Sequence, residues 1–402
     1  MRELTETEQD AVAQIETGPM LAQVLRWSAV NSGTGNLPGL ATMAELLGDA
    51  FSALPGELAL VEPEPADRVE ADGRVVAVEH GRHLRLSVRP DAPVRMLFTG
   101  HMDTVYPADH PFQQVTERGD GTVGGPGTAD MKGGLAVMLA ALGAVEASPL
   151  GSRIGYDVMI NSDEETGSLS SAPLIAELAR GKVAALTYEP ALPDGTLAGA
   201  RGGTGNFSVA VEGRAAHAGR NPEDGRNALV AAADLTLKLA AAASAGLTVN
   251  PARIDGGGPN NVVPDRAVLR VNFRPVDADA ARRARAAIDR AAADVAREHG
   301  VAVRVHGSFN RPPKPVDEGA AQLFALVGEA GAALGIPISA RATGGVCDGN
   351  NIAAAGVPVI DTMGVRGGAI HSPDEFMIVD SLAERAALSA VTVLRIAERG
   401  RV

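Results

Sequence analysis

The sequence predicts an α/β fold in which a smaller ferredoxin-like domain is inserted into a larger domain. The chain has 402 residues, which exceeds the usual size of a single domain, so two separate cores are expected. Apolar strand-like runs alternate with helical segments in the first and last parts of the chain, and this alternation is typical of a sheet with helices on its faces. The middle third has a different order of elements, which indicates a separate domain.

The larger domain is predicted to comprise residues 1–203 and 316–402. Residues 74–79 and 84–89 look like two strands that pair with each other, and the short apolar run at 95–98 stops at a Thr-Gly-His sequence. In chain order, the remaining elements predicted for this domain are a helix at 133–147, strands at 156–160 and 184–187, a helix at 320–334, a strand at 357–362 and a helix at 382–398.

The inserted domain is predicted to comprise residues 204–315. In chain order, its elements are a strand at 206–212, a helix at 227–243, strands at 246–254 and 267–273, a helix at 279–299 and a strand at 301–306. This β-α-β-β-α-β order is that of the ferredoxin-like unit. The segments before and after it therefore build one discontinuous domain.

Charge and composition exclude several classes of partner and site. The chain has 36 basic and 49 acidic side chains, and the formal charge of −13 repels both nucleic acid and anionic membranes. Cys347 is the only cysteine, which excludes an intramolecular disulfide and a thiolate zinc site. The acidic N-terminal segment does not read as a signal peptide, and the apolar run at 135–145 is shorter than the roughly 20 residues of a membrane span. A cytoplasmic location is expected.

Acidic residues and histidines follow the predicted strands of the larger domain. In chain order they are His101 with Asp103, Glu164 with Glu165, Glu189, and His371, while Asp130 lies in a Gly-rich turn before a helix. Ligands of open α/β sheets bind at the carboxyl ends of the strands, so these side chains are expected to meet in one cleft.

This set of side chains predicts a metal site. Imidazole and carboxylate ligands suit Zn²⁺, and two such ions need a bridging carboxylate and about two further ligands each. Asp130 is a candidate bridge, with His101 and Glu189 on one ion and Glu165 and His371 on the other. The sequence does not establish which residues share an ion.

Two further carboxylates have predicted roles next to the ligands. Asp103 lies two residues after His101, on the same side of an extended segment, and is expected to hold the imidazole tautomer. Glu164, beside the ligand Glu165, is free to take a proton from the metal-bound water and to pass it to the leaving nitrogen.

Each feature also has a simpler interpretation when taken alone. Isolated His-x-Asp sequences match by accident, and a Glu-Glu pair is usually a solvated turn. Asp130 can cap the helix that follows it, and His371 can be an exposed residue of a Gly-rich loop. The metal site is favoured because four strand ends each supply a ligand type.

Six motifs of this chain occur in the order found in one known family. They are GHMDTVY at 100–106, GPGTADMKGG at 125–134, NSDEETGS at 161–168, YEPA at 188–191, EGRAAHAG at 212–219 and GGAIHSPDE at 367–375. Together they closely resemble the zinc exopeptidases that include carboxypeptidase G-type glutamate carboxypeptidases, aminoacylase, acetylornithine deacetylase and succinyl-diaminopimelate desuccinylase. The resemblance spans nearly the whole chain and is nearest to the carboxypeptidase G branch.

The resemblance implies a catalytic dizinc domain with the ligands proposed above, Asp130 bridging and Glu164 acting as the base. It implies two Zn²⁺ ions per subunit, with Co²⁺ or Mn²⁺ able to substitute. The inserted domain is implied to be a lid and dimerisation module of a homodimer. His217 matches the histidine that reaches the partner subunit's site and stabilises the oxyanion.

Three further residues match substrate-binding positions of the family. Asn261 matches a polar contact to substrate, and Arg274 and Arg311 match positions that hold the free carboxylate, for which a guanidinium fork is well shaped. Arg274 can equally be an ordinary surface charge on its strand.

The chain departs from the carboxypeptidase G pattern at GGVCDGNN, where the branch has a Gly-rich turn with Thr before Asp. This departure places Cys347, Asp348 and Asn350 near the predicted carboxylate pocket and leaves substrate choice open. We do not expect Cys347 to act as a nucleophile, because no His–Cys arrangement is evident and a small buried thiol is the commoner state.

The function predicted from these observations is metal-dependent hydrolysis of an amide bond next to a free α-carboxylate, in an N-acyl amino acid or small peptide. An N-acyl-amino-acid deacylase or a dipeptidase is the alternative on the same scaffold. A metal-free binding protein that retains the fold is the alternative of another class, and the intact Glu164 and five ligands argue against it. Pocket loops rather than ligands decide which amino acid is released.

Overall fold

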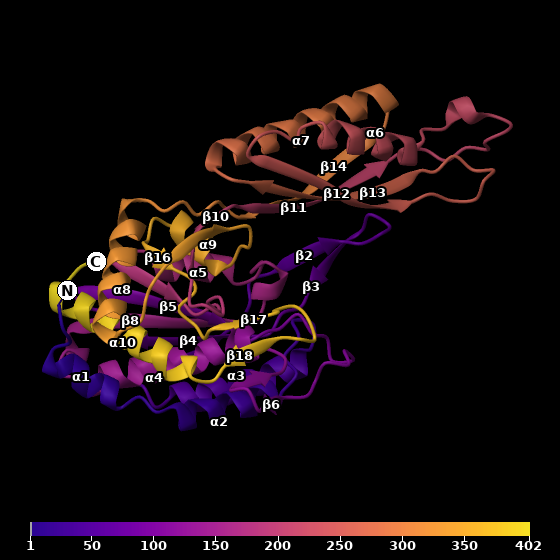
Figure 1. Ribbon diagram of the computed structural model, residues 1–402. Helices are drawn as coiled ribbons and strands as arrows, with labels where there is room; N and C mark the ends of the chain where they lie inside the picture. The colour runs from indigo at the N-terminus through magenta and orange to yellow at the C-terminus, as the bar shows by residue number, and fades with distance from the viewer. Residues whose placement is uncertain (1) are drawn as a thin grey trace.

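The computed structural model describes residues 2–402 and shows a larger body and a smaller body joined side by side (Figure 1). A six-stranded sheet forms the centre of the larger body, with the strand order β1-β4-β8-β5-β9-β16. Its strands are β1 (Glu57–Val61), β4 (His83–Val88), β5 (Val94–His101), β8 (Ile154–Asn161), β9 (Ala184–Thr187) and β16 (Val359–Ile360). β8, β5, β9 and β16 are mutually parallel, so their carboxyl ends lie along one edge.

Helices cover both faces of this sheet. On one face, α5 (Ala172–Ala179) and α9 (Asp348–Ala354) pack over β5, β8, β9 and β16 through a small apolar cluster. The helices that share the main core on the other face are α1 (Glu6–Ala13), α2 (Thr17–Ser28), α3 (Leu37–Phe51), α4 (Gly133–Ala147), α8 (Glu318–Leu334) and α10 (Ser381–Arg399). The α/β fold predicted from the alternation of elements is confirmed.

One helical segment has the composition of a membrane span but the burial of a core helix. Thr128–Ala147 is long and apolar enough to cross a membrane, yet 89% of its apolar stretch is buried inside the structure. It lies between the sheet and the other helices of that face, with α2 and α10 packed against α4.

Two small sheets border the edge where the parallel strands end. One pairs β10 (Leu197–Arg201) with β15 (Ala340–Thr343). The other contains β6 (Thr116–Arg118), β7 (Thr122–Gly124), β17 (Gly367–Gly368) and β18 (Phe376–Ile378).

The smaller body has the predicted β-α-β-β-α-β order. Its elements are β11 (Thr204–Glu212), α6 (Ala228–Ala240), β12 (Leu247–Gly256), β13 (Arg266–Pro275), α7 (Ala278–His299) and β14 (Ala302–Arg311). The sheet order is β12-β13-β11-β14, with every neighbouring pair antiparallel. The ferredoxin-like prediction is confirmed, whereas the exact domain limits at 203/204 and 315/316 stay predictions.

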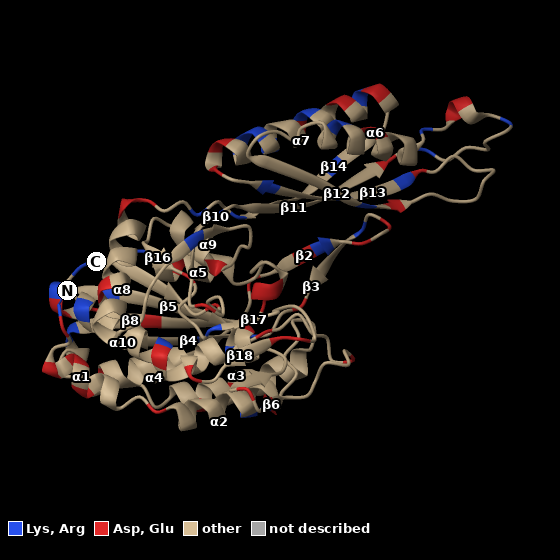
Figure 2. Cartoon of the chain, viewed as in Figure 1, with Lys and Arg blue, Asp and Glu red and all other residues tan. Residues whose placement is uncertain are grey.

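The two helices of the smaller body lie on its outer face, and its sheet faces the larger body (Figure 1). Alternate residues of β11 and β13, among them Val209 and Leu269, are buried under α6 and α7. Figure 2 shows acidic and basic residues interspersed along α7, so the outer surface of this helix carries both signs of charge.

The predicted pairing of residues 74–79 with 84–89 is wrong. β3 (Val75–Val78) pairs with β2 (Ala66–Val69), and β4 pairs with β1 and β8. β2 was missed because its sequence, ADRV, carries two charges, and the tight turn that forms the hairpin lies at Gly73, whose φ of +83° suits glycine.

The β2–β3 hairpin reaches from the larger body to the inner face of the smaller sheet (Figure 1). Val69 is buried against Ala210 and Val268 of that sheet. The Arg270 guanidinium donates a hydrogen bond of 2.9 Å to the Val69 carbonyl. The two bodies are therefore in contact through this hairpin, in addition to the two places where the chain passes from one body to the other.

Candidate metal centre and active site

The predicted ligands meet at the carboxyl edge of the parallel strands. His101 is the last residue of β5, Glu189 follows β9 by two residues, and Glu165 lies in the turn after β8. Asp130 precedes α4, and His371 lies on the loop after β17 with φ of +61°. His101, Glu165 and Glu189 follow three neighbouring parallel strands of the central sheet, as the strand-end argument expected, whereas His371 follows a short antiparallel strand of another sheet.

Asp130 lies between the two histidines. Its Oδ1 is 3.0 Å from Nε2 of His101, and its Oδ2 is 3.3 Å from Nε2 of His371. Oε2 of Glu189 is 3.8 Å from Nε2 of His101, and Oε2 of Glu165 is 3.2 Å from Nε2 of His371. The contacts thus form two groups that share the Asp130 carboxylate.

The charges of this cluster fit divalent cations. Burial, with the nearby Asp130 carboxylate, raises the pKa of Glu165 to about 7 and also raises the pKa of Glu189. Burial would raise the pKa of Asp130 too, but hydrogen bonds from both histidines outweigh burial and lower it. Mutually repelling buried carboxylates are stabilised by bound cations, and mixed imidazole and carboxylate donors suit zinc.

Glu164 lies close enough to the other donors to be a metal ligand, although the sequence predicts that it is the general base. His101, Asp130 and Glu165 each offer a donor atom within 4.8 Å of the others, and so do His101, Glu164 and Glu189. Glu164 nevertheless has another partner, because its Oε1 is 2.7 Å from Nη2 of Arg311. Glu165 lacks such a contact among the described residues and faces His371 instead, which makes it the better ligand of the two.

Asp103 is completely buried and organises the turn that carries the Glu-Glu pair. Its carboxylate accepts hydrogen bonds of 3.2 Å from the backbone N–H groups of Glu164 and Glu165 and one of 2.7 Å from the Thr34 hydroxyl. Nδ1 of His101 is 3.0 Å from the Asp103 carbonyl and 3.4 Å from its carboxylate. The residue therefore contacts both the imidazole and the Glu164 backbone.

Glu164 is 9% exposed, at the wall of the cavity described below. Burial raises its pKa well above the ordinary value, although the positive charge of Arg311 opposes this shift. A carboxylate with a raised pKa is suited to accepting a proton and then donating it.

Glu375 was assigned no role from the sequence, although it lies in the GGAIHSPDE motif. Its Oε1 accepts hydrogen bonds from the backbone N–H groups of Ala129 and Asp130, at 3.0 and 3.1 Å. The Tyr106 hydroxyl donates to its Oε2 at 3.0 Å. Glu375 thereby fixes the backbone that carries Asp130, and the only signal in the sequence was its acidic character four residues after His371.

A cavity of about 270 Å³ opens beside the carboxylate cluster. Asp130, Glu164, Glu165, Glu189 and His371 line one part of it. Its apolar wall is formed by Pro190, Leu192, Leu197, Ala198, Val346 and Ile370.

Two arginines that the sequence did not single out, Arg201 and Arg341, also line this cavity. The Arg201 guanidinium forms an ion pair with Asp361, with 2.8 Å between Nε and Oδ2. Arg341, in contrast, is exposed at the surface. Cys347 belongs to the wall as well and is 3% exposed, and burial raises the pKa of its thiol well above the ordinary value. This thiol environment agrees with the prediction that Cys347 is not a nucleophile.

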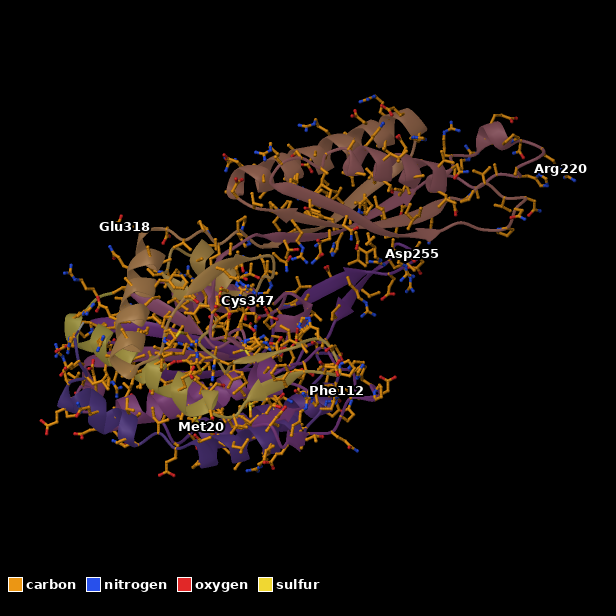
Figure 3. All side chains as sticks on the ribbon, viewed as in Figure 1. Met20, Phe112, Arg220, Asp255, Glu318 and Cys347 are labelled. Carbon is orange, nitrogen blue, oxygen red and sulfur yellow. The ribbon has the colours of Figure 1, made fainter. Side chains whose placement is uncertain are left out.

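Three of the four predicted residues of the inserted domain, His217, Asn261 and Arg274, lie apart from the site. His217 and Asn261 are exposed on adjacent loops, where the Ala218 N–H donates to the Asn261 carbonyl at 2.9 Å. Arg220, three residues after His217, is at the far tip of the smaller body, while Cys347 is inside the larger one (Figure 3). Arg274 is exposed on β13, and its guanidinium donates to Asn272 at 2.9 Å.

Arg311 lies at the site, but its guanidinium already has partners. It is 2% exposed and contacts the Glu164 carboxylate, the Asp348 carboxylate at 3.2 Å and the Ser168 hydroxyl at 3.0 Å. Binding of a substrate carboxylate by Arg311 would require one of these contacts to open.

Comparison with known proteins gives the family of this chain. The model of "Peptidase family M20/M25/M40" matches residues 97–395. Carboxypeptidase G2 from Pseudomonas sp. (strain RS-16) is 30% identical over 380 residues, which cover 91% of this chain and 86% of the relative.

Solved structures show the same fold. A tripeptidase from Staphylococcus aureus superposes with a TM-score of 0.71 at 24% identity, over 96% of this chain and 100% of the other. A dinuclear metal-binding peptidase from Bacillus subtilis superposes with a TM-score of 0.63 at 15% identity, over 95% and 98% of the two chains. The match over most of the length and the site at the sheet edge agree with the resemblance seen in the motifs: the chain is an enzyme that belongs to the M20/M25/M40 peptidase family of metal-dependent hydrolases.

Proposed function

We propose that this enzyme hydrolyses the amide bond next to a free α-carboxylate in an N-acyl amino acid or small peptide, as a glutamate carboxypeptidase does, with two zinc ions per subunit. The observation that carries the proposal is the Asp130 carboxylate, which lies between two histidine–carboxylate groups beside a small cavity. A cavity of about 270 Å³ suits an amino acid or a small acyl group rather than a folded protein.

His101, Asp130, Glu165, Glu189 and His371 would hold the two ions. When bound, the ions would polarise the scissile carbonyl and activate the attacking water. Co²⁺ or Mn²⁺ is expected to substitute for zinc, because these ions accept the same imidazole and carboxylate donors.

Glu164 takes the proton from the attacking water and delivers it to the nitrogen of the leaving group. Its carboxylate lines the cavity, and the Arg311 guanidinium behind it fixes its orientation. Asp103 keeps the turn that carries Glu164 in place through the Glu164 N–H. These contacts leave the carboxylate free to move a proton without moving the backbone.

His217 donates a hydrogen bond to the developing oxyanion of the partner subunit's site. The exposed position of His217, three residues before Arg220 at the far tip of the smaller body (Figure 3), supports this role in trans. An exposed apolar surface on α6, formed by Leu229, Val230 and Leu237, supports a homodimer that pairs through the inserted domain. Asn261 and Arg274 stay candidates for substrate contacts from the same domain.

The alternative function is that of a deacylase or dipeptidase on the same scaffold. It is favoured by the apolar cavity wall, which would accept an acyl chain or an apolar side chain. The chemistry at Glu164 is the same in both cases, so only the substrate separates them.

The test is an activity screen of the zinc-loaded enzyme against N-acyl amino acids, folate-like glutamates and dipeptides, with the Glu164→Gln variant as the control. Hydrolysis of a substrate with a free C-terminal carboxylate, but not of its amide or ester, supports the proposal. Equal hydrolysis of the free and blocked forms would contradict it. Preference for dipeptides with a free amino group would support the dipeptidase.

A further inference from the structure

Two short connections join the smaller body to the larger one, and they lie side by side. The first is Gly202-Gly203, between β10 and β11, and the second is Pro312-Pro313, after β14. The residues at their outer ends, Arg201 and Lys314, exchange two backbone hydrogen bonds of 2.8 and 2.9 Å. One connection is thus flexible, with two glycines, and the other is stiff, with two prolines.

A single buried side chain joins both connections. Nδ2 of Asn350 donates to the Gly202 carbonyl at 2.9 Å and to the Pro312 carbonyl at 2.7 Å. Its Oδ1 accepts from the backbone N–H of Cys347 at 3.2 Å. The amide group is 0% exposed, and both of its N–H donors are used, one for each connection.

The neighbours of Asn350 hold the same region of the smaller body. The Asp348 carboxylate accepts a hydrogen bond of 3.2 Å from the Arg311 guanidinium, and the Asn351 side-chain amide donates one of 2.9 Å to the Asn310 carbonyl. The first turn of α9 therefore contacts three successive residues, the last two of β14 and Pro312 of the connection. Only Asn350 also contacts the other connection.

The same turn begins in the wall of the cavity. Cys347, whose N–H is held by Asn350, lines the cavity beside Glu164 and Glu189. The GGVCDGNN sequence, which departs from the carboxypeptidase G pattern, thus joins the cavity wall to the connections of the inserted domain.

We propose that Asn350 is a positioning residue that fixes the angle of the inserted domain over the active site by tying its flexible connection to its stiff one. The expected effect on catalysis rests on the proposed function, in which the inserted domain supplies His217 to an active site, but the expected effect on domain geometry does not. Without the two hydrogen bonds, the Arg201–Lys314 backbone pair and the β2–β3 hairpin still hold the bodies together. The Gly202 and Pro312 carbonyls are then no longer tied to each other, so the angle between the bodies is held less tightly.

The test uses Asn350→Asp, which keeps the shape of the side chain but presents a carboxylate, an acceptor only, to the two carbonyls. Asn351→Ala is the matched control, because it removes a hydrogen bond from the same helix to one connected strand only. Spin labels are placed on cysteines introduced at the exposed residues Arg290 and Gln322, on α7 and α8. Cys347 is buried and stays unlabelled, and labelled chains are diluted with unlabelled protein so that distances within one chain are measured.

We expect a narrow distance distribution for the otherwise unmodified chain and for Asn351→Ala, and a broadened one for Asn350→Asp. In the zinc-loaded enzyme, Asn350→Asp should lower kcat by on the order of 10²-fold, the effect of misplacing a group by about 1 Å, with zinc content unchanged. Asn350→Ser, which retains one donor, should also give a broader distribution than Asn351→Ala, and it takes the place of Asn350→Asp if that variant does not fold.

A distribution for both Asn350 variants as narrow as that of Asn351→Ala would overturn the proposal. Equal broadening in Asn350→Asp and Asn351→Ala would also overturn it, because the whole turn rather than Asn350 would then fix the angle. Failure of the proposed function would appear differently, as a lack of hydrolysis across the substrate screen with the distances still dependent on Asn350.

Discussion

At the scale of single residues, Glu164 and Glu165 are neighbours with different surroundings. Glu164 contacts Arg311, and Glu165 contacts His371. We predict that Glu164→Gln retains both zinc ions and lowers kcat by about 10²-fold or more, the usual scale of general acid–base catalysis. Glu165→Gln should instead lose zinc, as measured by elemental analysis after dialysis. Equal zinc loss in the two variants would show that these roles are assigned wrongly.

A second prediction about a single residue concerns Arg341 and comes from the structure alone. It is an exposed guanidinium that lines the cavity. Arg341→Glu should raise KM for substrates with a second carboxylate by about fivefold relative to neutral substrates, which is the scale of an exposed ion pair. Arg180→Glu, an equal charge change on the exposed end of α5, is the control. The same KM increase in both variants would exclude a local role for Arg341.

The sequence predicted that the candidate ligands lie together because strand ends are recognisable from local patterns. His101, Glu165 and Glu189 each follow an apolar run, and neighbouring parallel strands bring such positions together. The partners of Glu375 and Asn350 could not be predicted in this way. Glu375 holds the backbone of a residue 245 positions earlier, and only the folded chain brings the two together.

At the scale of elements, most helices and strands were predicted from hydrophobic periodicity. Among the exceptions is the β2–β3 hairpin: β3 was predicted as a strand but with another partner, and β2 was missed because its exposed and charged sequence lacks the alternation of a sheet that covers a core. Its stability comes from contacts with the smaller body, such as Val69 with Val268, which local sequence does not reveal. Tertiary contact rather than strand propensity decides this element.

Helix α6 carries a prediction about assembly. Leu237 is 70% exposed, and Val230, two helical turns before it, is 53% exposed on the same side. If this surface pairs two subunits, Leu237→Glu should convert a dimer to a monomer, as measured by sedimentation velocity. Leu169→Glu, at an exposed leucine of the larger body, is the control and should leave the assembly unchanged. A monomeric unmodified protein at micromolar concentration would contradict the dimer itself.

At the scale of the whole molecule, the structure separates Glu164 from His217. We predict that Glu164→Ala and His217→Ala are each nearly inactive, since loss of one oxyanion donor costs ~10²–10³ in kcat. Mixing them under conditions of subunit exchange should restore activity, because a mixed dimer contains one site with both residues intact.

The control for this experiment is the exchange itself, followed with differently tagged subunits. If tagged subunits exchange and activity stays absent, His217 does not act on the partner's site. The residue would then be a contact within its own chain or a structural histidine of the inserted domain.

The paired backbones of Arg201 and Lys314 have a consequence for how the chain is built. The chain leaves the larger body and returns to it at one point, where the two strands are already hydrogen-bonded. A short turn could therefore replace residues 203–312 without separating any strand of the central sheet. The inserted domain is in this respect an exchangeable module: domains of different origin can be grafted at a single junction, and the larger body retains its own connectivity.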